Sequence, residues 1–488
     1  MLYDQAASPF SKKAFQHPGA SYRGAPFWSW NTLITKEMIE KQILEFKKMG
    51  MGGFHIHVRV GLKNQYLSDE FMELIRFSNE KAKENGMLCW LYDEDRYSSG
   101  IAGGEVTKRI EYRARWLKLS TQWDERLQDS FDVFMEKQRR NEKTPGCFLC
   151  AYDIEMENGV LKGSSLIDKE VEARGVKWYL YIELAQESPW CNNQTYVDTL
   201  KREAVAHFIH LTHDRYDQTI GGDFGTSVPA IFTDEPHING LRLPEKAEDD
   251  RDVCLPYTEA LPEAFGTVEG RDFFQWLPDF VWNRPGGGAL KARYHYYHTL
   301  SEMFSRVYCG QIGEWCAAHG LLSTGHLLGE DSVRGQASIV GDAMRCYREF
   351  QLPGIDNLCD NRDFSAAKQA ASIARQYGKP GVLSEMYGVT QWDFDFKGYK
   401  LAGDWQAALG ITARVPHLAW ALHEWRSQAG LSRRHRLAVA LVQGFFVSGG
   451  PLRPPQLLHD AGKSHSARGC FASGGILLAA ERSGQPIR

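Results

Sequence analysis

Two glutamates follow short apolar runs, in positions from which they could act together on a bound substrate. Glu235 comes after the run 229–232, and Glu385 comes after the run 381–384. Hydrolysis of a glycosidic bond needs such a pair, because one carboxylic acid protonates the leaving oxygen while a second carboxylate attacks the anomeric carbon or activates water. The two groups must differ in pKa, and a neighbour such as Asp234 could raise one of them. We therefore predict that Glu235 and Glu385 are catalytic.

Other polar and aromatic side chains follow the same kind of run and could bind a sugar. Aromatic faces can pack on the C–H faces of sugar rings, and arginine, histidine and aspartate can bond the hydroxyl groups. We predict as substrate-binding residues Trp28, Trp30, Asn31, His55, His57, Arg59, Tyr92, Asp93, Asp95, Arg96, Asp234, His326, Tyr387 and Trp392. Four further acidic residues complete this set: Glu330, Asp331, Asp356 and Asp360. The last two could instead only cap the next helix.

Several of these residues also have simpler interpretations. His55 and His57 alternate along a strand and so face the same side. With nearby carboxylates they could bind the metal of another class of hydrolase, or they could serve only as hydrogen-bonding groups. Trp28 and Trp30 also share a face and could pack in the core instead of stacking on a sugar. The run of acidic residues from Asp93 to Asp95 could form an internal network with Arg96. The cysteines at 147 and 150 form a single CxxC without a second pair, which favours free thiols.

The overall composition excludes several other classes of protein. The chain has 488 residues, of which 43% are hydrophobic and 24% charged, enough for a sizeable core. A net charge of −4 argues against a nucleic-acid-binding protein, and no run of about 18 uncharged apolar residues predicts a membrane span. The N-terminus lacks the pattern of a secretion signal. We expect a cytoplasmic protein whose partner is an oligosaccharide or glycoside; the oligomeric state is left open.

Short apolar runs alternate with amphipathic helical patterns through residues 1–420, which predicts repeated strand–helix units. The expected strands are 25–30, 53–57, 87–92, 229–232, 321–325, 354–358, 381–384 and 415–420. The expected helices are one from 35 to about 50, and then 68–85, 199–213, 291–318, 335–350, 365–377 and 403–413. Eight such units predict an α/β fold of the (β/α)8 TIM-barrel type, whose active site lies at the C-terminal ends of the strands. Strands four and seven lie across such a barrel, so Glu235 and Glu385 could flank a sugar.

Two segments depart from this pattern. Residues 114–190 read as antiparallel strands, with a hairpin signal at Asn158–Gly159, and predict an inserted β subdomain within the barrel. Residues 421–488 contain no Tyr, Thr, Asn or Met, and they hold 9 Lys+Arg against 3 Asp+Glu. We therefore expect an atypical C-terminal tail after residue 420.

Five motifs of this chain resemble glycoside hydrolase family 106, the α-L-rhamnosidase-like proteins. They are Ala25–Asn31, Gly52–Leu62, Trp90–Arg96, Phe232–Pro236 and Ser384–Gly388, and the resemblance covers residues 20–420. It is closer to an uncharacterised intracellular branch of the group than to its characterised rhamnosidases. It implies a (β/α)8 catalytic domain with two glutamates as acid and base, carried onto Glu235 and Glu385. Characterised relatives invert the anomeric configuration and use calcium, so the resemblance makes calcium possible, although this sequence requires no cofactor and contains no calcium loop.

The tail adds a hypothesis about the gene. Family members usually carry a segment resembling Ser-Met-x-Gly-x-x-Lys-Arg-Asp-Tyr-Pro after strand eight, where this chain has residues 421–433. Codons permitted for this stretch, read one base later, can spell a similar segment. We therefore predict a frameshift near Trp420, which resequencing of the gene would test. The alternative to an active glycosidase is then a truncated or degenerate carbohydrate-binding barrel without turnover.

Overall fold

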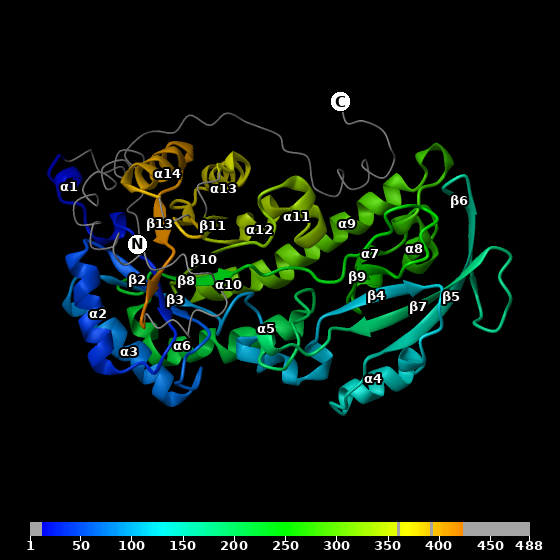
Figure 1. Cartoon of the computed structure of the whole chain (residues 1–488), viewed down its shortest axis with the longest axis horizontal. Coiled ribbons are helices and arrows are strands. Elements are labelled where there is room, and N and C mark those ends of the chain that lie inside the picture. The colour runs from blue at the N-terminus through cyan, green and yellow to red at the C-terminus, as the bar shows by residue number, and fades with distance from the viewer. Residues whose placement is uncertain (1–11, 359–361, 391–393, 423–488) are drawn as a thin grey trace.

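The computed structural model describes residues 12–358, 362–390 and 394–422. Its centre is a parallel sheet of nine strands that curls into a barrel, on the left of Figure 1. In sheet order the strands are β13 (Ala413–Pro416), β12 (Leu383–Met386), β11 (Leu352–Asn357), β10 (Leu322–His326), β8 (Ala230–Asp234), β3 (Leu88–Tyr92), β2 (Gly53–Val58), β1 (Phe27–Trp30) and β14 (Ala419–Trp420).

The eighth barrel strand is divided, which differs from the single strand expected at 415–420. β13 pairs with β12 and β14 pairs with β1, so these two consecutive pieces of chain close the ring. The division falls after Pro416, the last residue of β13. The backbone N–H of the next residue, His417, still donates to the carbonyl of Met386 at 2.9 Å, and pairing with β12 ends there.

Helices surround the barrel as the βα pattern predicts. They are α2 (Lys36–Lys48), α3 (Asp69–Glu84), α5 (Arg202–Leu211), α6 (His213–Ile220), α9 (Leu290–Phe304), α10 (Gln311–Ala318), α11 (Val333–Ile339), α12 (Ala343–Glu349), α13 (Phe364–Gln376) and α14 (Phe396–Leu409), with a short α1 (Lys12–Gln16) before β1. α9 and α10 are joined through a π-helical turn at Ser305–Gly310, so the long helix expected at 291–318 is present. None of the described helices combines the length and apolar character needed to cross a membrane.

Three expected helices have different bounds, for local reasons. The helix expected at 199–213 divides at Thr212, whose hydroxyl donates to the carbonyl of Phe208. The helix expected at 335–350 divides at Gly341, which has a φ of 83°, and Asp342 then caps α12. The helix expected at 403–413 begins earlier, because the side chain of Asp395 accepts a hydrogen bond from the backbone N–H of Gly398.

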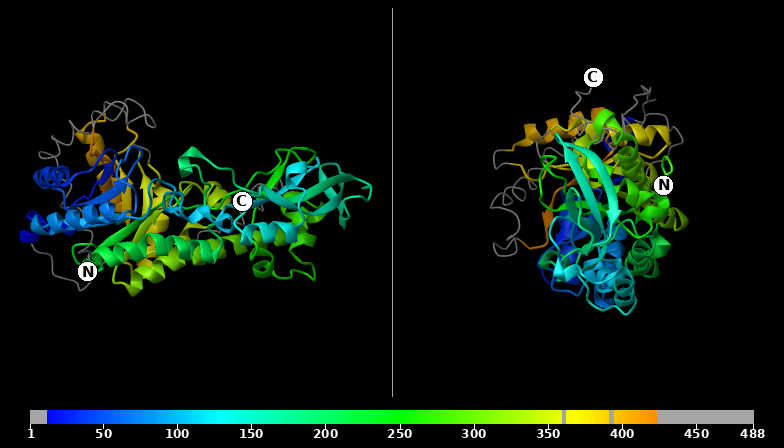
Figure 2. Two further views of the ribbon diagram at one scale, coloured as in Figure 1. Left: turned by 90° about the horizontal axis from the view of Figure 1, so that it is seen from below. Right: turned by 90° about the vertical axis from the view of Figure 1, so that its right-hand side faces the viewer.

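A second, antiparallel sheet lies at the other end of the elongated molecule (Figures 1 and 2). Its strands, in sheet order, are β6 (Val160–Ile167), β5 (Gly146–Glu157), β7 (Val176–Leu184), β4 (Arg115–Ser120) and β9 (Val253–Pro256), and α4 (Phe131–Arg139) packs on β5. Four of these strands come from the segment between β3 and β8, as an inserted β subdomain requires. β9 follows β8 and was not expected. With α7 (Leu261–Phe265) and α8 (Phe273–Val281) it gives structure to a stretch that the sequence indicated as irregular.

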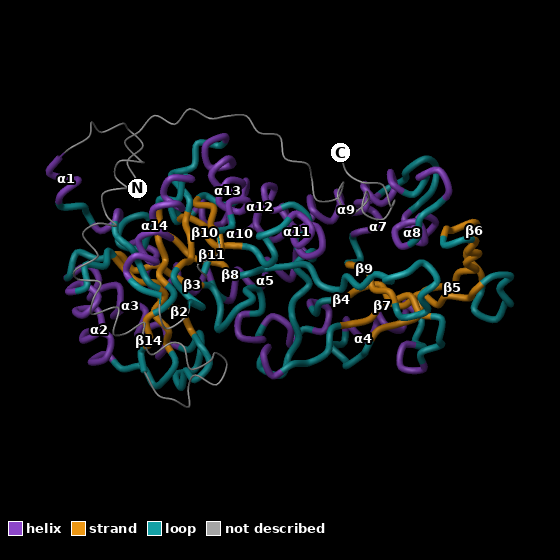
Figure 3. The backbone as a smooth tube through the Cα atoms, turned by 45° about the horizontal axis from the view of Figure 1, so that its top comes forward, coloured by secondary structure: helices purple, strands orange, loops and turns teal. Residues whose placement is uncertain are grey.

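The barrel has two apolar layers, because side chains alternate along each strand. Phe27, Trp90, Tyr92 and Phe232 belong to the cluster that fills the barrel interior. Alternate residues such as Trp28 belong to the larger cluster between the strands and the helices. The two groups of strands, separated along the molecule, are visible in Figure 3. The structure thus confirms the predicted α/β barrel with an inserted antiparallel subdomain, while the predicted tail lies outside the described residues except for 421 and 422.

Candidate active site

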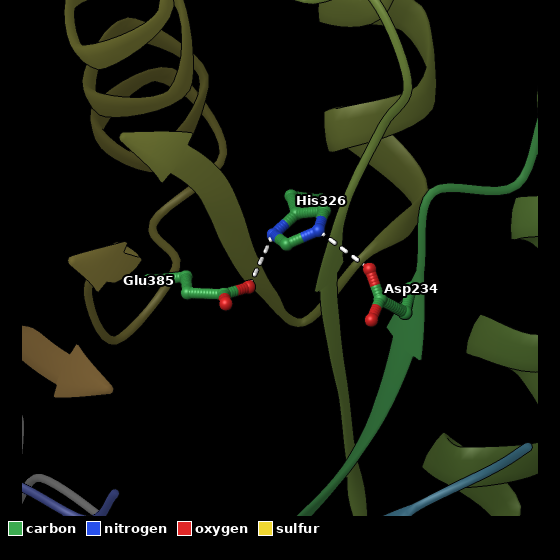
Figure 4. Close-up of side chains that lie close together, drawn as sticks. All are labelled: Asp234, His326 and Glu385. Carbon is green, nitrogen blue, oxygen red and sulfur yellow. Dashed lines mark hydrogen bonds and ion pairs between the residues drawn. The ribbon is translucent and has the colours of Figure 1, made fainter. Parts of the chain in front are cut away.

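His326 lies between two carboxylates at the C-terminal end of the barrel (Figure 4). Its Nε2 atom is 2.7 Å from Oδ1 of Asp234, the last residue of β8, and its Nδ1 atom is 3.6 Å from Oε2 of Glu385 in β12. All three side chains are buried. Predicted catalytic and substrate-binding residues, far apart in the sequence, therefore meet around one imidazole ring.

The strand register explains this meeting. His326 pairs with Asp234 between β10 and β8, and Asp356 pairs with Glu385 between β11 and β12, so these side chains leave the sheet at matching levels. Gly325 precedes His326 and has a φ of 142°, and a Cβ atom there would lie 1.9 Å from the backbone oxygen of Thr233. Only glycine allows β10 to approach β8 this closely.

Asp234 and His326 form a buried ion pair. Burial acts to raise the pKa of Asp234, but the charge of His326 and hydrogen bonds from His326 and His57 hold this pKa well below its ordinary value. Burial acts to lower the pKa of His326, but the neighbouring Asp234 raises it well above its ordinary value. The hydroxyl of Tyr92 also donates to Asp234, at 2.7 Å. The pair is therefore a carboxylate and an imidazolium at neutral pH.

Glu235 is partly exposed at the same end of the barrel. One of its carboxylate oxygens, a ring nitrogen of His326 and a carboxylate oxygen of Asp356 all lie within 4.8 Å of one another. Burial and the charge of Asp234 raise the pKa of Glu235 to about 7. Glu235 also has a left-handed backbone with a φ of 48°, a conformation that costs about 1–3 kcal/mol and concentrates at functional sites.

Asp356 belongs to this group and does not cap the following helix. Asp363 caps α13, through hydrogen bonds from the backbone of Ser365 and Ala366 to its carboxylate. Burial raises the pKa of Asp356. Asp360, its predicted companion, lies outside the described residues.

Glu385 is buried, as Asp234 is, and has basic neighbours on two sides. Nε2 of His417 lies 3.9 Å from its Oε1 atom, opposite His326, and Nη2 of Arg59 donates to the same His417 nitrogen at 3.1 Å. Burial and the charge of Asp356 nevertheless raise the pKa of Glu385 well above its ordinary value. This carboxyl therefore keeps its proton to a higher pH than an ordinary glutamate does.

His417 was missed by the sequence analysis. It follows the end of β13, and a Cβ atom on Gly388 would lie 2.4 Å from its Nδ1 atom. The available signal was its place in the eighth strand, where a histidine near the C-terminal end should have been counted with the other strand ends.

Glu330 acts as a buried support for the site. Its Oε2 atom accepts from the Tyr347 hydroxyl at 2.5 Å and from the backbone of Leu327 at 3.3 Å, and its Oε1 atom accepts from the backbone of Asp356. Burial raises its pKa to about 8. These bonds tie the chain after β10 to β11 and so position Asp356.

The acidic residues after β3 mainly hold their own loop. Glu94 accepts backbone hydrogen bonds from residue 95 and from each residue of 100–103. The hydroxyl of Ser99 donates to Asp93 at 2.6 Å, and Asp95 accepts from Arg96 at 2.9 Å. This arrangement favours the internal-network interpretation of Asp93, Asp95 and Arg96 over direct contact with a sugar.

The two tryptophans of β1 point away from the site. Trp28 and Trp30 are fully buried on the helix side of the strand, and Nε1 of Trp28 donates to the side chain of Gln42 in α2 at 2.6 Å. Their rings contact each other edge-to-face at 5.5 Å. Because β1 alternates, Phe27 faces the barrel interior, while the indole of Trp28 faces α2 and that of Trp30 contacts Phe71 of α3. Core packing therefore replaces the predicted stacking on a sugar.

The two histidines of β2 lie at different depths of the barrel. His55 contacts the backbone oxygen of Ala25 at 3.0 Å through its Nδ1 atom. His57 stacks on Phe27 at 4.5 Å and places Nε2 3.9 Å from Asp234. Burial lowers the pKa of His55 to about 3 and that of His57 to about 4, so both are neutral. His57 therefore borders the site and His55 lies in its floor.

Two of the remaining predicted residues contact other parts of the chain. Asn31 exchanges two hydrogen bonds with the backbone of Leu422, at 2.9 and 3.1 Å. Tyr387 packs against Tyr399 of α14, with ring centroids 4.9 Å apart. Trp392 is outside the described residues.

The donor set does not fit calcium. Two groups of described residues have ligand atoms within 4.8 Å of one another: Asp234, His326 and Glu385, and Glu235, His326 and Asp356. Calcium takes about six to eight oxygen ligands. Both groups depend on His326, whose Nε2 atom already bonds Asp234 and which carries its own positive charge. His55 and His57 belong to neither group, so the described residues do not support the metal site that these two could have formed.

Comparison with known proteins supports the fold. No protein-family model matches the chain, and no curated protein sequence matches it. Among solved structures it is similar to a rhamnosidase from Novosphingobium sp. PP1Y, with a TM-score of 0.58 and 15% identity over 91% of this chain and 61% of that one. It is also similar to a β-galactosidase from the Antarctic haloarchaeon Halorubrum lacusprofundi (TM-score 0.44, 9% identity, 88% of this chain and 57% of that one). A β-amylase catalytic domain from Paenibacillus polymyxa follows (TM-score 0.42, 10% identity, 81% and 93%). The chain spans about three-fifths of the length of the rhamnosidase structure, whose barrel fold it shares.

Proposed function

We propose that this chain is a glycoside hydrolase that uses Glu235 and Glu385 as its acid–base pair. The observation that carries the proposal is the approach of both glutamates to His326 at the C-terminal end of the barrel. Carboxyls with raised pKa values and a fixed neighbouring charge are the groups that glycoside hydrolysis uses. The fold shared with a rhamnosidase structure agrees with this proposal.

The environments of the two glutamates suggest how they divide the work. Glu385 is buried and its pKa is raised well above the ordinary value, so we assign it as the general acid. Glu235 is partly exposed, where water can reach it, and titrates near neutral pH, so we assign it as the general base.

The reaction then follows from these two positions. Glu235 removes a proton from a water molecule, whose oxygen forms the new bond to the anomeric carbon. The bond from that carbon to the leaving oxygen breaks, and Glu385 donates its proton to that oxygen. The Asp234–His326 pair holds a fixed charge beside Glu385, and it stabilises the carboxylate that Glu385 becomes after donating its proton.

We propose an α-L-rhamnoside as the first substrate class to test, on the resemblance of the five sequence motifs. The experiment is a panel of 4-nitrophenyl glycosides that includes α-L-rhamnopyranoside, assayed with the full chain and with Glu235→Gln and Glu385→Gln. Each substitution keeps the size of the side chain and removes its acid–base function, so we expect turnover to fall about 10²–10⁴-fold. Glu170→Gln, at an exposed glutamate of the inserted subdomain, is the matched control.

A variant that kept the full rate would remove its residue from the catalytic pair. Activity on another glycoside alone would support the glycoside hydrolase proposal and would contradict rhamnose as the sugar.

A carbohydrate-binding barrel without turnover is the second candidate. The change of composition after residue 420 favours it. Calorimetric titration with methyl α-L-rhamnopyranoside separates the two candidates, because saturable binding without release of product from any glycoside of the panel identifies the binding protein.

A further inference from the structure

An exposed aromatic pair lies beside the candidate active site and takes no part in the proposed acid–base chemistry. Trp190 comes from the short turn Pro189–Cys191 after β7 of the inserted subdomain, and its side chain is 41% exposed. Tyr97 comes from the loop after barrel strand β3 and is partly exposed. The two rings contact each other at 5.2 Å with an interplanar angle of 68°.

The indole is held in place by polar contacts at its edge. Its Nε1 atom donates to the backbone oxygen of Tyr97 at 2.5 Å, and the guanidinium of Arg96 lies 5.8 Å from the ring. Arg96 is itself bonded to Asp95 and to Asn192. A large apolar ring that is fixed by its edge and still exposed is ready to bind a ligand with little loss of conformational entropy.

A continuous series of contacts leads from this pair to Glu385. The guanidinium of Arg59 lies 5.4 Å from the Tyr97 ring, and the same side chain donates to His417 at 3.1 Å. His417 in turn lies 3.9 Å from Glu385. Tyr97 is therefore three side-chain contacts away from the proposed general acid, and Trp190 is one contact further.

Tyr97 also lies close to the proposed base. Burial raises the pKa of its hydroxyl, the charge of Arg59 lowers it, and the charge of Glu235 raises it. Tyr97 is thus close enough to Glu235 to respond to its charge, and it is linked to Glu385 through Arg59 and His417. The opposite direction is closed, because the barrel interior beneath the site is filled by Phe27, Phe232 and His55. Among the described residues, the direction left open to a sugar held between the glutamates is the end of the barrel at which Tyr97 lies.

We propose that Trp190 and Tyr97 form the subsite for the leaving group, and that this subsite selects substrates whose leaving group is itself a ring, either a second sugar or an aromatic aglycone. This inference rests on the proposed glycosidase function and deepens it. The indole supplies the flat apolar face for the second ring. It also assigns a role to the insertion: the β subdomain delivers an aromatic side chain to the barrel.

The test compares leaving groups on one sugar. The values of kcat/KM are measured for methyl α-L-rhamnopyranoside, 4-nitrophenyl α-L-rhamnopyranoside and the disaccharide α-L-rhamnopyranosyl-(1→6)-D-glucose, and each ring-bearing substrate is expressed relative to the methyl glycoside. Trp190→Ala should lower both ratios about tenfold, because stacking contributes only when the leaving group has a ring. Trp123→Ala is the matched control, since this indole lies in the same subdomain among Phe148, Tyr179 and Tyr181. It should leave both ratios unchanged.

A second variant separates stacking from loop support. Trp190→Phe keeps a ring but loses the hydrogen bond to Tyr97, so its ratios should stay within about threefold of the native chain. If the kcat/KM ratios of Trp190→Phe fall as far as those of Trp190→Ala, the indole acts by holding the loop, and the subsite proposal is overturned. Unchanged ratios in Trp190→Ala would also overturn it while leaving the hydrolase proposal intact.

If no rhamnoside is hydrolysed, the subsite proposal is tested by calorimetric titration with the same disaccharide and with the methyl glycoside. Tighter binding of the disaccharide that is lost in Trp190→Ala supports the subsite without the catalytic function. Equal binding of the two sugars, or no binding at all, overturns the subsite.

Discussion

The side chains of Asp234 and His326 form a buried ion pair 2.7 Å long that joins β8 to β10 inside the barrel end. Both side chains are almost completely inaccessible, so neither charge has water to compensate it. The same imidazolium reaches to 3.6 Å from Glu385. One histidine thus balances one carboxylate and sets the electrostatic environment of a second, which makes it the centre of the site.

Replacement of His326 by glutamine should strongly destabilise the protein. The substitution leaves Asp234 buried without its charged partner, a situation that costs about 3–5 kcal/mol. Urea denaturation at pH 7 measures the change in the free energy of unfolding. His210→Gln is the matched control, because His210 makes a similar 2.9 Å contact with Asp214 but is 69% exposed, and such surface pairs contribute about 0–1 kcal/mol. Equal small losses for the two variants would show that His326 is uncharged.

The pH dependence of kcat/KM should follow Glu235. Its pKa is raised to about 7, so below that pH it holds a proton and cannot accept one from water. We therefore expect kcat/KM to rise as the pH increases through about 7, and to fall again at higher pH when Glu385 loses its proton. Values of kcat/KM measured between pH 5 and pH 10 on 4-nitrophenyl α-L-rhamnopyranoside provide the profile. This profile reports the pKa values of the acid and the base in the protein without bound substrate.

Asp356→Asn tests the cause of that profile. The charge of Asp356 is one of those that raise the pKa of Glu235. Its removal should therefore move the rise of kcat/KM on the acid side of the profile (its lower limb) to a lower pH. Glu84→Gln, at a glutamate that is 59% exposed and pairs with Lys81, should leave the limb in place. A lower limb that stays near pH 7 in Asp356→Asn would assign it to another group.

Removal of divalent cations should leave the enzyme unaffected. His326 already supplies a positive charge beside Asp234 and Glu385, and the donor set does not suit calcium. The activity and the melting temperature measured after dialysis against EDTA should therefore equal those measured with added calcium. A loss of activity that calcium restores would show that a cation completes the site and would contradict this assignment of charge.

Trp28→Ala should destabilise the chain by about 3–5 kcal/mol, because it opens a cavity between β1 and α2 and removes the partner of Gln42. Thermal and urea denaturation measure this loss. Trp190→Ala removes the same atoms from an exposed position and should cost far less. A Trp28→Ala protein as stable as the native chain would contradict the packing role found for this side chain.

Much of the fold could be predicted from the sequence because it depends on local periodicity. The strands at β1, β2, β3, β8, β10, β11 and β12 overlap the apolar runs from which they were expected, and α3 and α13 differ from their expected bounds by one residue at each end. Strands repeat hydrophobic residues about every two residues and helices about every 3.6, and both spacings can be read from the sequence. Breaks within elements, such as that at Thr212, depend on single hydrogen bonds and are not visible in that spacing.

The candidate site could be predicted only as a set of residue types at strand ends. The sequence by itself placed Asp234, Glu235, His326 and Glu385 at those ends, since a barrel brings the ends of its strands together. The tertiary structure decided which side chains face inward. It turned Trp28 toward α2 and Trp30 toward α3, and it added His417 and Trp190, which come from distant parts of the chain. The physical reason is that the spacing of hydrophobic residues determines whether a segment forms a helix or a strand. Which neighbours a side chain meets depends instead on the register between strands and on where loops bring distant segments together.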